Sequence, residues 1–373
     1  MQPIIREVKD KHDLRLYIYL PQLLYQNFPN WVPPIYADEW NFHDPSQNKA
    51  YRHAEVIRFL AFQDEKPIGR IMGIIHHAYN EAHQEKTGRF FQLDCIPDQE
   101  VAQALISTIE GWARSKGMNK VIGPFGFSEK DPQGLQIEGF EHLPVIATPT
   151  NPAYLPRLVE AAGYLKEVDC VSYVMKLTNG LPVSFERVYN RIRQNLKLRL
   201  IEFTSKRHLK PYIVPVFRLV NETYKSLFGF VPMSEDEMKK FAAQYLPILD
   251  PHFVKIVTNE HDEIVAFVVS MPDMSQGIQR AKGKLFPFGF IHILRSAKKT
   301  KQLDLLLGAI KPEYRGKGIT VLMGKALIST ALQHGMETMD SHLILETNIR
   351  MRNECENIGG IVYKRYRVFQ KNL

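Results

Sequence analysis

The sequence predicts an α/β fold divided between two domains. With 373 residues, the chain is longer than most single domains. The stretch 305–332, LLLGAIKPEYRGKGITVLMGKALISTAL, begins with an apolar run of strand length at Leu305–Ile310. After a turn, apolar residues recur from Ile319 to Ala331 at the three- and four-residue spacing of one helix face. The stretch is therefore predicted to form a strand, a glycine-containing turn and a helix.

The turn Arg315-Gly316-Lys317-Gly318 has the features of a phosphate-binding site. The first N–H groups of a helix have no partner within the helix and carry partial positive charge. The two glycines leave those groups accessible, and the two cations add charge. Neither the Walker pattern nor GxGxxG is present. On spacing alone, an exposed basic turn that binds nothing is equally compatible with these residues.

The segment KPEYRGKGI resembles the coenzyme A loop of the GNAT superfamily of N-acyltransferases, whose pattern is [RQ]-x-x-G-x-[GA]. Arg315, Gly318 and Thr320 occupy the pattern positions, and Thr320 departs from the usual Gly or Ala. The elements that follow also have the GNAT order, namely helix, strand, helix, glycine turn and final strand, at 324–334, 341–346, 349–358, 359–360 and 361–369. The resemblance implies a central mixed, mostly antiparallel sheet flanked by helices.

Residues 1–180 repeat this order of elements without the coenzyme loop. At the matching turn, the segment from Cys95 to Glu100 contains no glycine, and Asp98 and Glu100 stand at the helix start. Carboxylates there stabilise the helix dipole and repel pyrophosphate. We therefore expect a tandem GNAT arrangement. It would have a degenerate N-terminal domain at 1–180, a linking helix at 181–197 and a C-terminal domain with the coenzyme loop at 198–373.

Two long segments interrupt the pattern. Residues 123–150 alternate turn residues with apolar ones, which predicts an ordered connection. Residues 272–300 place Phe286, Phe288 and Phe290 beside many cations. This second segment is compatible with three roles: covering an acceptor site, touching a membrane, or packing against the first half of the chain.

The net charge of +8 is unevenly distributed. Residues 1–180 contain 18 Lys and Arg against 22 Asp and Glu, whereas the remainder contains 30 against 18. A basic C-terminal half suits coenzyme A, and it also suits nucleic acid, an acidic membrane surface or an ordinary solvated face. No recognised nucleic-acid motif and no run long enough to span a membrane is visible.

The three cysteines lie far apart, with no metal-ligand spacing, which favours a reducing compartment. The N-terminus, MQPIIREVKDKHD, is charged and lacks the apolar core of a signal peptide. We therefore expect a cytoplasmic protein without a bound metal.

The resemblance implies that the pantetheine arm of acetyl-CoA or another acyl-CoA lies between the fourth and fifth strands of the C-terminal sheet. Backbone groups of the fourth strand hold that arm in GNAT folds. The residues expected to contact the coenzyme are Gly308, Ala309, Ile310, Arg315, Gly316, Lys317, Gly318, Ile319, Thr320 and Asn353.

Acyl transfer to an amine needs a base for the amine proton, and an acid can protonate the leaving thiolate. Glu346, at the carboxyl end of the predicted fifth strand, is the candidate base, although a structural role is equally compatible. Many GNAT enzymes carry a tyrosine acid in the last helix, and alignment on Gly359 places Cys355 there. The expected function is acyl-CoA-dependent N-acyl transfer to an unidentified small-molecule or peptide amine. The acyl group expected from the resemblance is acetyl. The alternative is a catalytically weak or inactive GNAT-like binding or regulatory protein.

Overall fold

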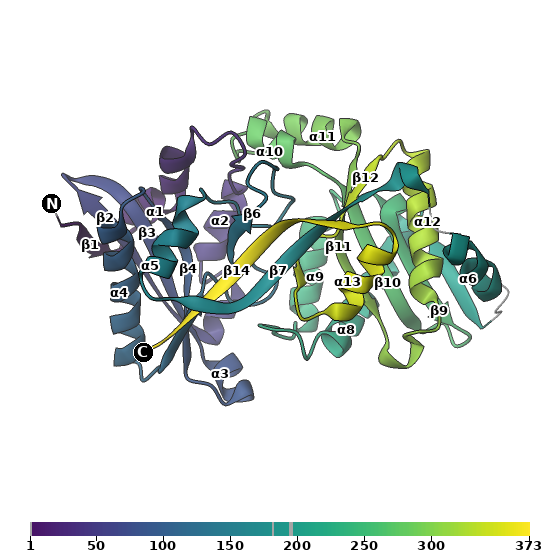
Figure 1. Cartoon of the computed structure of the whole chain (residues 1–373), viewed down its shortest axis with the longest axis horizontal. Helices are drawn as coiled ribbons and strands as arrows, with labels where there is room; N and C mark the ends of the chain where they lie inside the picture. Colours follow the sequence, from purple (N-terminus) through teal and green to yellow (C-terminus); the bar gives the residue numbers. More distant parts are fainter. Residues whose placement is uncertain (1, 181–182, 194–196) are drawn as a thin grey trace. The chain divides into compact units, whose positions relative to one another are not determined.

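The computed structural model describes residues 2–180, 183–193 and 197–373, and it has an α/β architecture with helices on both faces of mixed sheets (Figure 1). The chain divides into two compact units. Unit 1 combines the residues up to Val171 with Met274–Ser296 and Tyr363–Leu373. Unit 2 contains Ser172–Asp273 and Ala297–Val362.

Unit 1 has the strand order β1-β2-β3-β4-β5-β14, and β6 pairs with β14. All of these pairs are antiparallel except β4 with β5, which is parallel. The strands are β1 (Ile4–Glu7), β2 (Ala54–Gln63), β3 (Lys66–His76), β4 (Thr87–Cys95), β5 (Lys120–Gly123), β6 (Leu135–Glu138) and β14 (Ile361–Asn372). The helices are α1 (Lys11–Tyr25), α2 (Tyr36–His43), α3 (His77–His83), α4 (Gln99–Ser115), α5 (Tyr154–Ala161), α10 (Ser275–Arg280) and most of α11 (Gly289–Lys299).

Unit 2 has the strand order β7-β12-β11-β10-β9-β8. Here the β11–β12 pair is parallel and the others are antiparallel. The strands are β7 (Leu165–Lys176), of which Ser172–Lys176 belong to this unit, β8 (Leu198–Glu202), β9 (Val254–Asn259), β10 (Ile264–Pro272), β11 (Gln302–Ile310), β12 (Thr338–Asp340) and β13 (Ile344–Leu345). The helices are α6 (Val183–Arg193), α7 (Lys206–Leu209), α8 (Ile213–Thr223), α9 (Glu235–Tyr245), α12 (Ile319–Gln333) and α13 (Ile349–Asn357).

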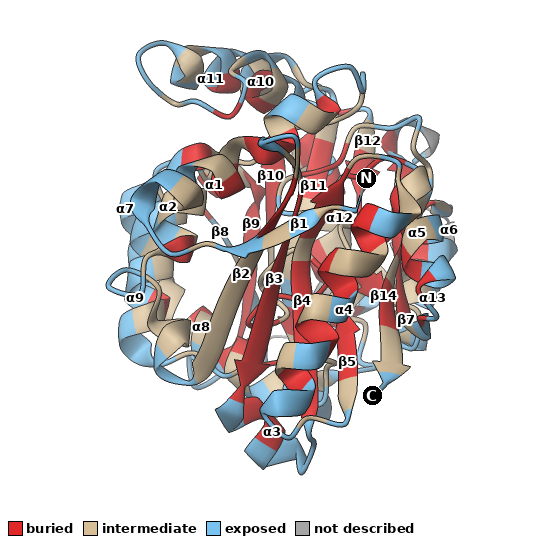
Figure 2. Ribbon diagram, turned by 90° about the vertical axis from the view of Figure 1, so that its left-hand side faces the viewer, coloured by how far each residue is buried: buried red, intermediate tan, exposed pale blue. Residues whose placement is uncertain are grey.

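Successive residues of a strand point to opposite faces of the sheet. Neighbouring apolar residues therefore pack against helices on both faces of each sheet. In unit 1, Ala61 packs in the cluster that contains α4 and α5, whereas Leu60 packs in the cluster that contains α1. In unit 2, Ile256 packs with α8, and Val257 packs with α12 and α6. The central strands are correspondingly the most buried, and Figure 2 shows β3 and β4 mainly in red.

The predicted fold class is confirmed, but the two compact units are not the consecutive halves 1–180 and 198–373. Val174–Lys176 of β7 pair with β12 in unit 2. In turn, Phe369–Asn372 of β14 pair with β5 in unit 1. The periodicity of a sequence indicates which face of a strand is buried, but it does not indicate which strand is its partner. It therefore could not predict that the end of β7 pairs in unit 2 and the end of β14 pairs in unit 1. The predicted linking helix corresponds to α6, and residues 181–182 and 194–196 lie outside the described residues.

The segment 272–300 contacts the first half of the chain, which confirms one of its three expected roles. The Gln279 side chain donates to the carbonyl oxygens of Pro29, at 2.7 Å, and Trp31, at 3.0 Å. The backbone N–H of Tyr36 donates to the Gly283 carbonyl at 3.0 Å. These contacts fix α10 and the turn after it on the proline-rich loop 26–35 of unit 1 and on the start of α2.

Candidate functional site

Strands β11 and β12 of unit 2 pair over three residues and then separate. The last pair is Asp304 with Asp340, after which β12 ends while β11 continues to Ile310. From Leu305 onward, β11 has a strand partner on one side, β10, among the described residues. The opposite edge of β11 therefore presents backbone groups that an extended ligand can bind.

The direction of the backbone groups on β11 follows from three hydrogen bonds. The N–H of Lys311 donates to Val265 of β10 at 2.8 Å, so residues 309 and 311 face β10 by strand alternation. The carbonyls of Gly308 and Ile310 instead accept from Tyr224 Oη, at 2.8 Å, and Arg315 Nε, at 3.0 Å. The backbone groups of Gly308 and Ile310 thus point to the free edge of β11, whereas those of Ala309 point to β10.

A β-bulge lies on β11 where the two strands diverge. Val269 pairs with Leu307 and Ser270 pairs with Leu305, so Leu306 is the extra residue. A bulge interrupts the ladder and redirects backbone groups, and bulges are frequent beside active sites. The Leu306 bulge therefore marks the start of the free edge.

The loop between β11 and α12 contains a short 3₁₀ turn, Pro312–Tyr314, followed by exposed Arg315, Gly316 and Lys317. Gly316 and Gly318 both have left-handed backbones, with φ of 72° and 80°. Gly318 is the N-cap of α12 and supplies no side-chain hydrogen bond to the first turn. The corresponding helix of unit 1 is different, because Asp98 accepts from the N–H groups of Glu100 and Val101 at 2.8 and 3.3 Å.

Gly318 also makes room for α6. A Cβ atom at this position would lie 2.0 Å from Ile192 Cδ1 and 3.0 Å from Val188 Cγ1. The same face of α6 packs on Ile319, Leu322 and Met323 of α12. Gly318 is therefore required for helix packing as well as for its backbone conformation.

Thr320, in the first turn of α12, hydrogen-bonds the carboxylate of Glu354 on α13. Burial raises the pKa of Glu354, and the Thr320 hydrogen bond and Arg350 lower it less. The side chain that departs from the GNAT pattern is thus turned toward α13 and holds an acidic group close to the helix start. Asn353, the neighbouring residue on α13, is exposed.

Tyr173 joins β7 to α13 at the level where β11 and β12 separate. Its neighbour Val174 pairs with Asp340, and the Tyr173 N–H donates to Ser341 Oγ at 2.8 Å. The Tyr173 hydroxyl donates to Glu356 at 2.5 Å and accepts from Arg352 Nε at 3.0 Å. Burial and the Glu356 hydrogen bond raise the pKa of Tyr173, against the Arg352 contact, which lowers it.

Glu346 does not stand at the end of the strand that pairs with β11. The predicted strand 341–346 is interrupted by His342, whose φ is 57°, and only Ile344–Leu345 resume as β13. The carbonyl oxygen of Glu346 accepts from Arg352 Nη1 at 3.2 Å, so the residue lies beside the Tyr173–Arg352 contact. Its side chain is half-buried.

Cys355 is buried, with 2% of its surface exposed, and burial raises the pKa of its thiol to about 12. A thiol in this environment is neutral near pH 7 and shielded from an acceptor.

The sequence alone did not indicate Tyr173, because it lies on β7, far along the chain from the predicted site residues on β11, α12 and α13. Tyr173 lies 179 residues from Arg352 in sequence, so no local pattern connects them. Asp304 and Asp340 are both fully buried. In the sequence, a carboxylate directly before the apolar run Leu305–Ile310 is a visible signal of an unusual position. Within the described ranges, no group of three or more His, Cys, Asp or Glu side chains could hold a metal ion.

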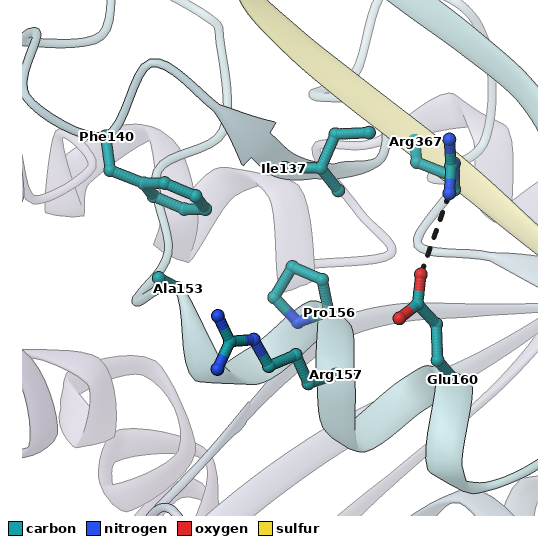
Figure 3. Close-up of a pocket in the computed structure, with 7 residues that line it drawn as sticks. All are labelled: Ile137, Phe140, Ala153, Pro156, Arg157, Glu160 and Arg367. Carbon is teal, nitrogen blue, oxygen red and sulfur yellow. Dashed lines mark ion pairs between the residues drawn. The ribbon is translucent and has the colours of Figure 1, made fainter.

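A pocket of about 190 Å³ lies in unit 1 and contains none of the predicted site residues (Figure 3). Arg367 closes one side of it through an ion pair with Glu160, at 3.6 Å. The lining residues are Ile137, Phe140, Ala153, Pro156, Arg157, Glu160 and Arg367.

No family model matches the sequence. Protein YghO of Escherichia coli is 28% identical over 381 residues, which covers 100% of this chain and 96% of that protein. Bacterial ceramide synthase of Caulobacter vibrioides is 28% identical over 375 residues, which covers 98% of this chain and 96% of that protein.

Solved structures show the same architecture over almost the whole chain. A tandem GNAT protein from the clavulanic acid biosynthesis pathway has a TM-score of 0.55 at 12% identity, and the match covers 100% of this chain and 98% of that one. A GCN5-related N-acetyltransferase from Sphaerobacter thermophilus has a TM-score of 0.53 at 13% identity, covering 99% and 95%. The chain therefore has the fold of the GNAT acetyltransferases, in its tandem form.

Proposed function

We propose that this protein is an acyl-CoA-dependent N-acyltransferase whose coenzyme binds unit 2. The observation that carries the proposal is the free edge of β11. This edge begins at the Leu306 bulge and includes the backbone groups of Gly308 and Ile310. It is followed by a basic loop, and the helix after the loop, α12, has no side-chain cap. A backbone edge followed by exposed helix N–H groups suits a ligand with amides at one end and phosphates at the other.

In this proposal, the pantetheine amides bind the backbone groups of Gly308 and Ile310. The diphosphate binds the N–H groups of the α12 first turn, beside Arg315 and Lys317. Unit 1 offers no second coenzyme site of this kind, because the Asp98 carboxylate already caps α4. The expected stoichiometry is one coenzyme per chain.

The reaction forms a C–N bond and breaks the C–S bond of the thioester. The acceptor amine loses a proton to a base and attacks the carbonyl carbon. The carbonyl oxygen becomes an oxyanion, which backbone donors near the Leu306 bulge stabilise. Collapse of this intermediate expels the thiolate of coenzyme A, which then takes a proton.

Glu346 is the proposed base, and Tyr173 is the proposed proton donor to the thiolate. The raised pKa of Tyr173 keeps its hydroxyl protonated near neutral pH, which an acid requires. Tyr173 contacts α13 at residues 352 and 356, the turns that flank Cys355. It therefore supplies a phenol to the helix on which the GNAT pattern has its tyrosine.

The relative named bacterial ceramide synthase supports a choice of acceptor. Ceramides are amides of long-chain amino alcohols, and the match extends over 98% of this chain. We therefore propose a long-chain amino alcohol as the acceptor class. The assay below determines whether the acyl group is acetyl or longer.

Thiol release by the purified full chain tests the function. The acyl-CoA donors range from acetyl to long-chain, and each is paired with a long-chain amino alcohol, a polyamine or a lysine peptide. Amine-dependent thiol release that Lys317→Glu reduces at limiting acyl-CoA supports the proposal. Release of no thiol with any pair, together with no heat of coenzyme A binding by calorimetry, overturns it.

A second candidate is a coenzyme-binding protein without turnover. The carboxylate of Glu354 beside Thr320 favours it, because a negative charge at the start of α12 opposes a diphosphate. Coenzyme A binding without amine-dependent thiol release is the result that this candidate predicts.

A further inference from the structure

Four large apolar side chains are exposed in and before α11. Phe286, Phe288, Phe290 and Leu294 have 81, 68, 42 and 48% of their surface exposed. We call these four residues the α11 patch. Single exposed apolar side chains are common, but four within nine residues, with the rings of Phe286 and Phe290 6.3 Å apart, make a concentration of the kind that marks a binding site. Figure 2 shows α11 and the turn before it largely in pale blue.

The α11 patch is held in place by the opposite side of the segment. Ile293 is buried, and a Cβ atom on Gly277 of α10 would lie 2.6 Å from the Ile293 Cα atom. The chain before the patch is fixed through the Gln279 and Gly283 hydrogen bonds to the loop of unit 1. The exposure therefore belongs to an ordered, closely packed helix pair.

The charge around the α11 patch has one sign. Residues 274–303 contain seven Lys and Arg and no Asp or Glu. Lys301 forms an ion pair with Glu337. The other six are exposed, and no ion pair of theirs is found among the described residues: Arg280, Lys282, Lys284, Arg295, Lys298 and Lys299.

We propose that the α11 patch binds the surface of an anionic lipid bilayer. The phenylalanines and Leu294 would enter the boundary between headgroups and acyl chains, and the surrounding cations would contact lipid phosphates. The long aliphatic stems of Lys298 and Lys299 allow their ammonium groups to stay at headgroup level. No helix in the described ranges has the length and apolarity to cross a membrane.

The charge and apolarity of the α11 patch favour an anionic bilayer over a second copy of the chain or a nucleic acid. A second copy of the chain would bring six like charges against six on the same face, which opposes association. Nucleic acid would satisfy the cations but leave Leu294 and the outermost phenylalanine rings without an apolar environment. The inference does not rest on acyl transfer, because it concerns a different surface and is tested without turnover.

Vesicle flotation of the full chain tests the proposal. Vesicles of phosphatidylcholine alone are compared with vesicles in which about a third of the lipid is phosphatidylglycerol. The double variant Phe288→Ser/Leu294→Ser is compared with Leu165→Ser/Ile361→Ser, whose original side chains are 69 and 68% exposed elsewhere. The charge variant Lys298→Glu/Lys299→Glu is compared with Lys9→Glu/Lys66→Glu. Melting curves confirm that each variant is folded.

We expect binding to anionic vesicles only, weakened about tenfold or more by either α11 variant and unchanged by either control. Raising NaCl from about 0.1 to about 0.5 M should also weaken it. No flotation, or flotation that both α11 variants retain, overturns the proposal. Phe288-dependent binding of single-stranded DNA or self-association, without vesicle binding, overturns it in favour of those partners.

Discussion

Asp304 and Asp340 are register partners on β11 and β12, and they are the last pair before these parallel strands separate. The separation has a local cause. Asp340 Oδ1 accepts the N–H of His342 at 2.6 Å, and His342 takes a left-handed backbone with φ of 57°. The chain after Asp340 consequently leaves the direction of β12. The free edge of β11, on which the proposed coenzyme site depends, follows from this turn.

Lys317→Glu should weaken coenzyme A binding by about tenfold or more, because it replaces a cation beside the proposed diphosphate with an anion. Lys317 is exposed, so the change should leave the fold intact. Lys239→Glu on α9, also exposed, is the matched control and should bind normally. Calorimetry measures both affinities and the expected stoichiometry of one. Equal affinities for the two variants would refute the loop as the phosphate site.

Gly318→Ala should destabilise the protein by about 2–3 kcal/mol, because the new Cβ atom meets Ile192 at 2.0 Å and the left-handed backbone disfavours alanine. Gly316→Ala has a similar φ but no atom within 4 Å, so it should cost only about 1 kcal/mol. Urea unfolding measures the difference.

Adding Ile192→Ala to Gly318→Ala should recover part of the loss, because the smaller side chain removes the contact. If the two glycine variants are equally stable, α6 does not pack on Gly318 in solution. This packing also means that a large residue at Gly318 cannot test coenzyme binding alone, since it would displace α6.

The strand, loop and helix at 302–333 could be predicted from the sequence because their signals are local. The change from a continuous apolar run to helical spacing is visible in the residues themselves, and so are the two glycines that both adopt positive φ. Asp98 as a cap could likewise be predicted, because a side-chain oxygen at an N-cap needs only the N–H groups two and three residues ahead.

The remaining features depend on partners distant in sequence. The pairing of β14 with β5, the bulge at Leu306 and the engagement of Ala309 with β10 are all choices of hydrogen-bond partner between strands. Such choices leave no trace in the periodicity of one strand. The contact of Thr320 with Glu354 is similar, because the family pattern records only that a small residue is usual there.

The affinity for coenzyme A should fall as pH rises through the raised pKa of Glu354. Below that pKa the carboxyl group is neutral, and above it a negative charge lies beside Thr320, where it opposes the diphosphate. Glu354→Gln should remove this dependence and tighten binding by about threefold to tenfold at neutral pH. Glu222→Gln, an exposed site on α8, should behave as the unmodified chain. Parallel pH curves for all three proteins would exclude Glu354 from the effect.

Glu346→Gln should lower turnover by roughly 10²–10⁴-fold without weakening coenzyme binding, because a general base contributes that much to amine attack. A carboxylate that only supports the fold would instead lower the melting temperature and leave turnover per folded molecule intact. Both quantities are measured on one preparation. Unaltered turnover would remove Glu346 from the mechanism.

Tyr173→Phe should lower kcat while leaving the affinity for coenzyme A unchanged, because the lost hydroxyl acts after both substrates are bound. An acid that protonates the thiolate contributes about 10²–10⁴-fold, so the loss should fall in that range. Tyr212→Phe, on a half-buried ring that packs edge-to-face on Phe203, is the matched control.

The same hydroxyl braces β7 against α13 through Arg352 and Glu356, so lost stability must be separated from lost chemistry. The pH profile makes this separation. An acid with a raised pKa keeps turnover constant until pH approaches that pKa, and turnover then declines as the phenol ionises. Tyr173→Phe should abolish this alkaline decline and leave the acidic limb in place. If the decline persists in the variant and only the melting temperature falls, Tyr173 is a structural brace and the thiolate takes its proton from another source.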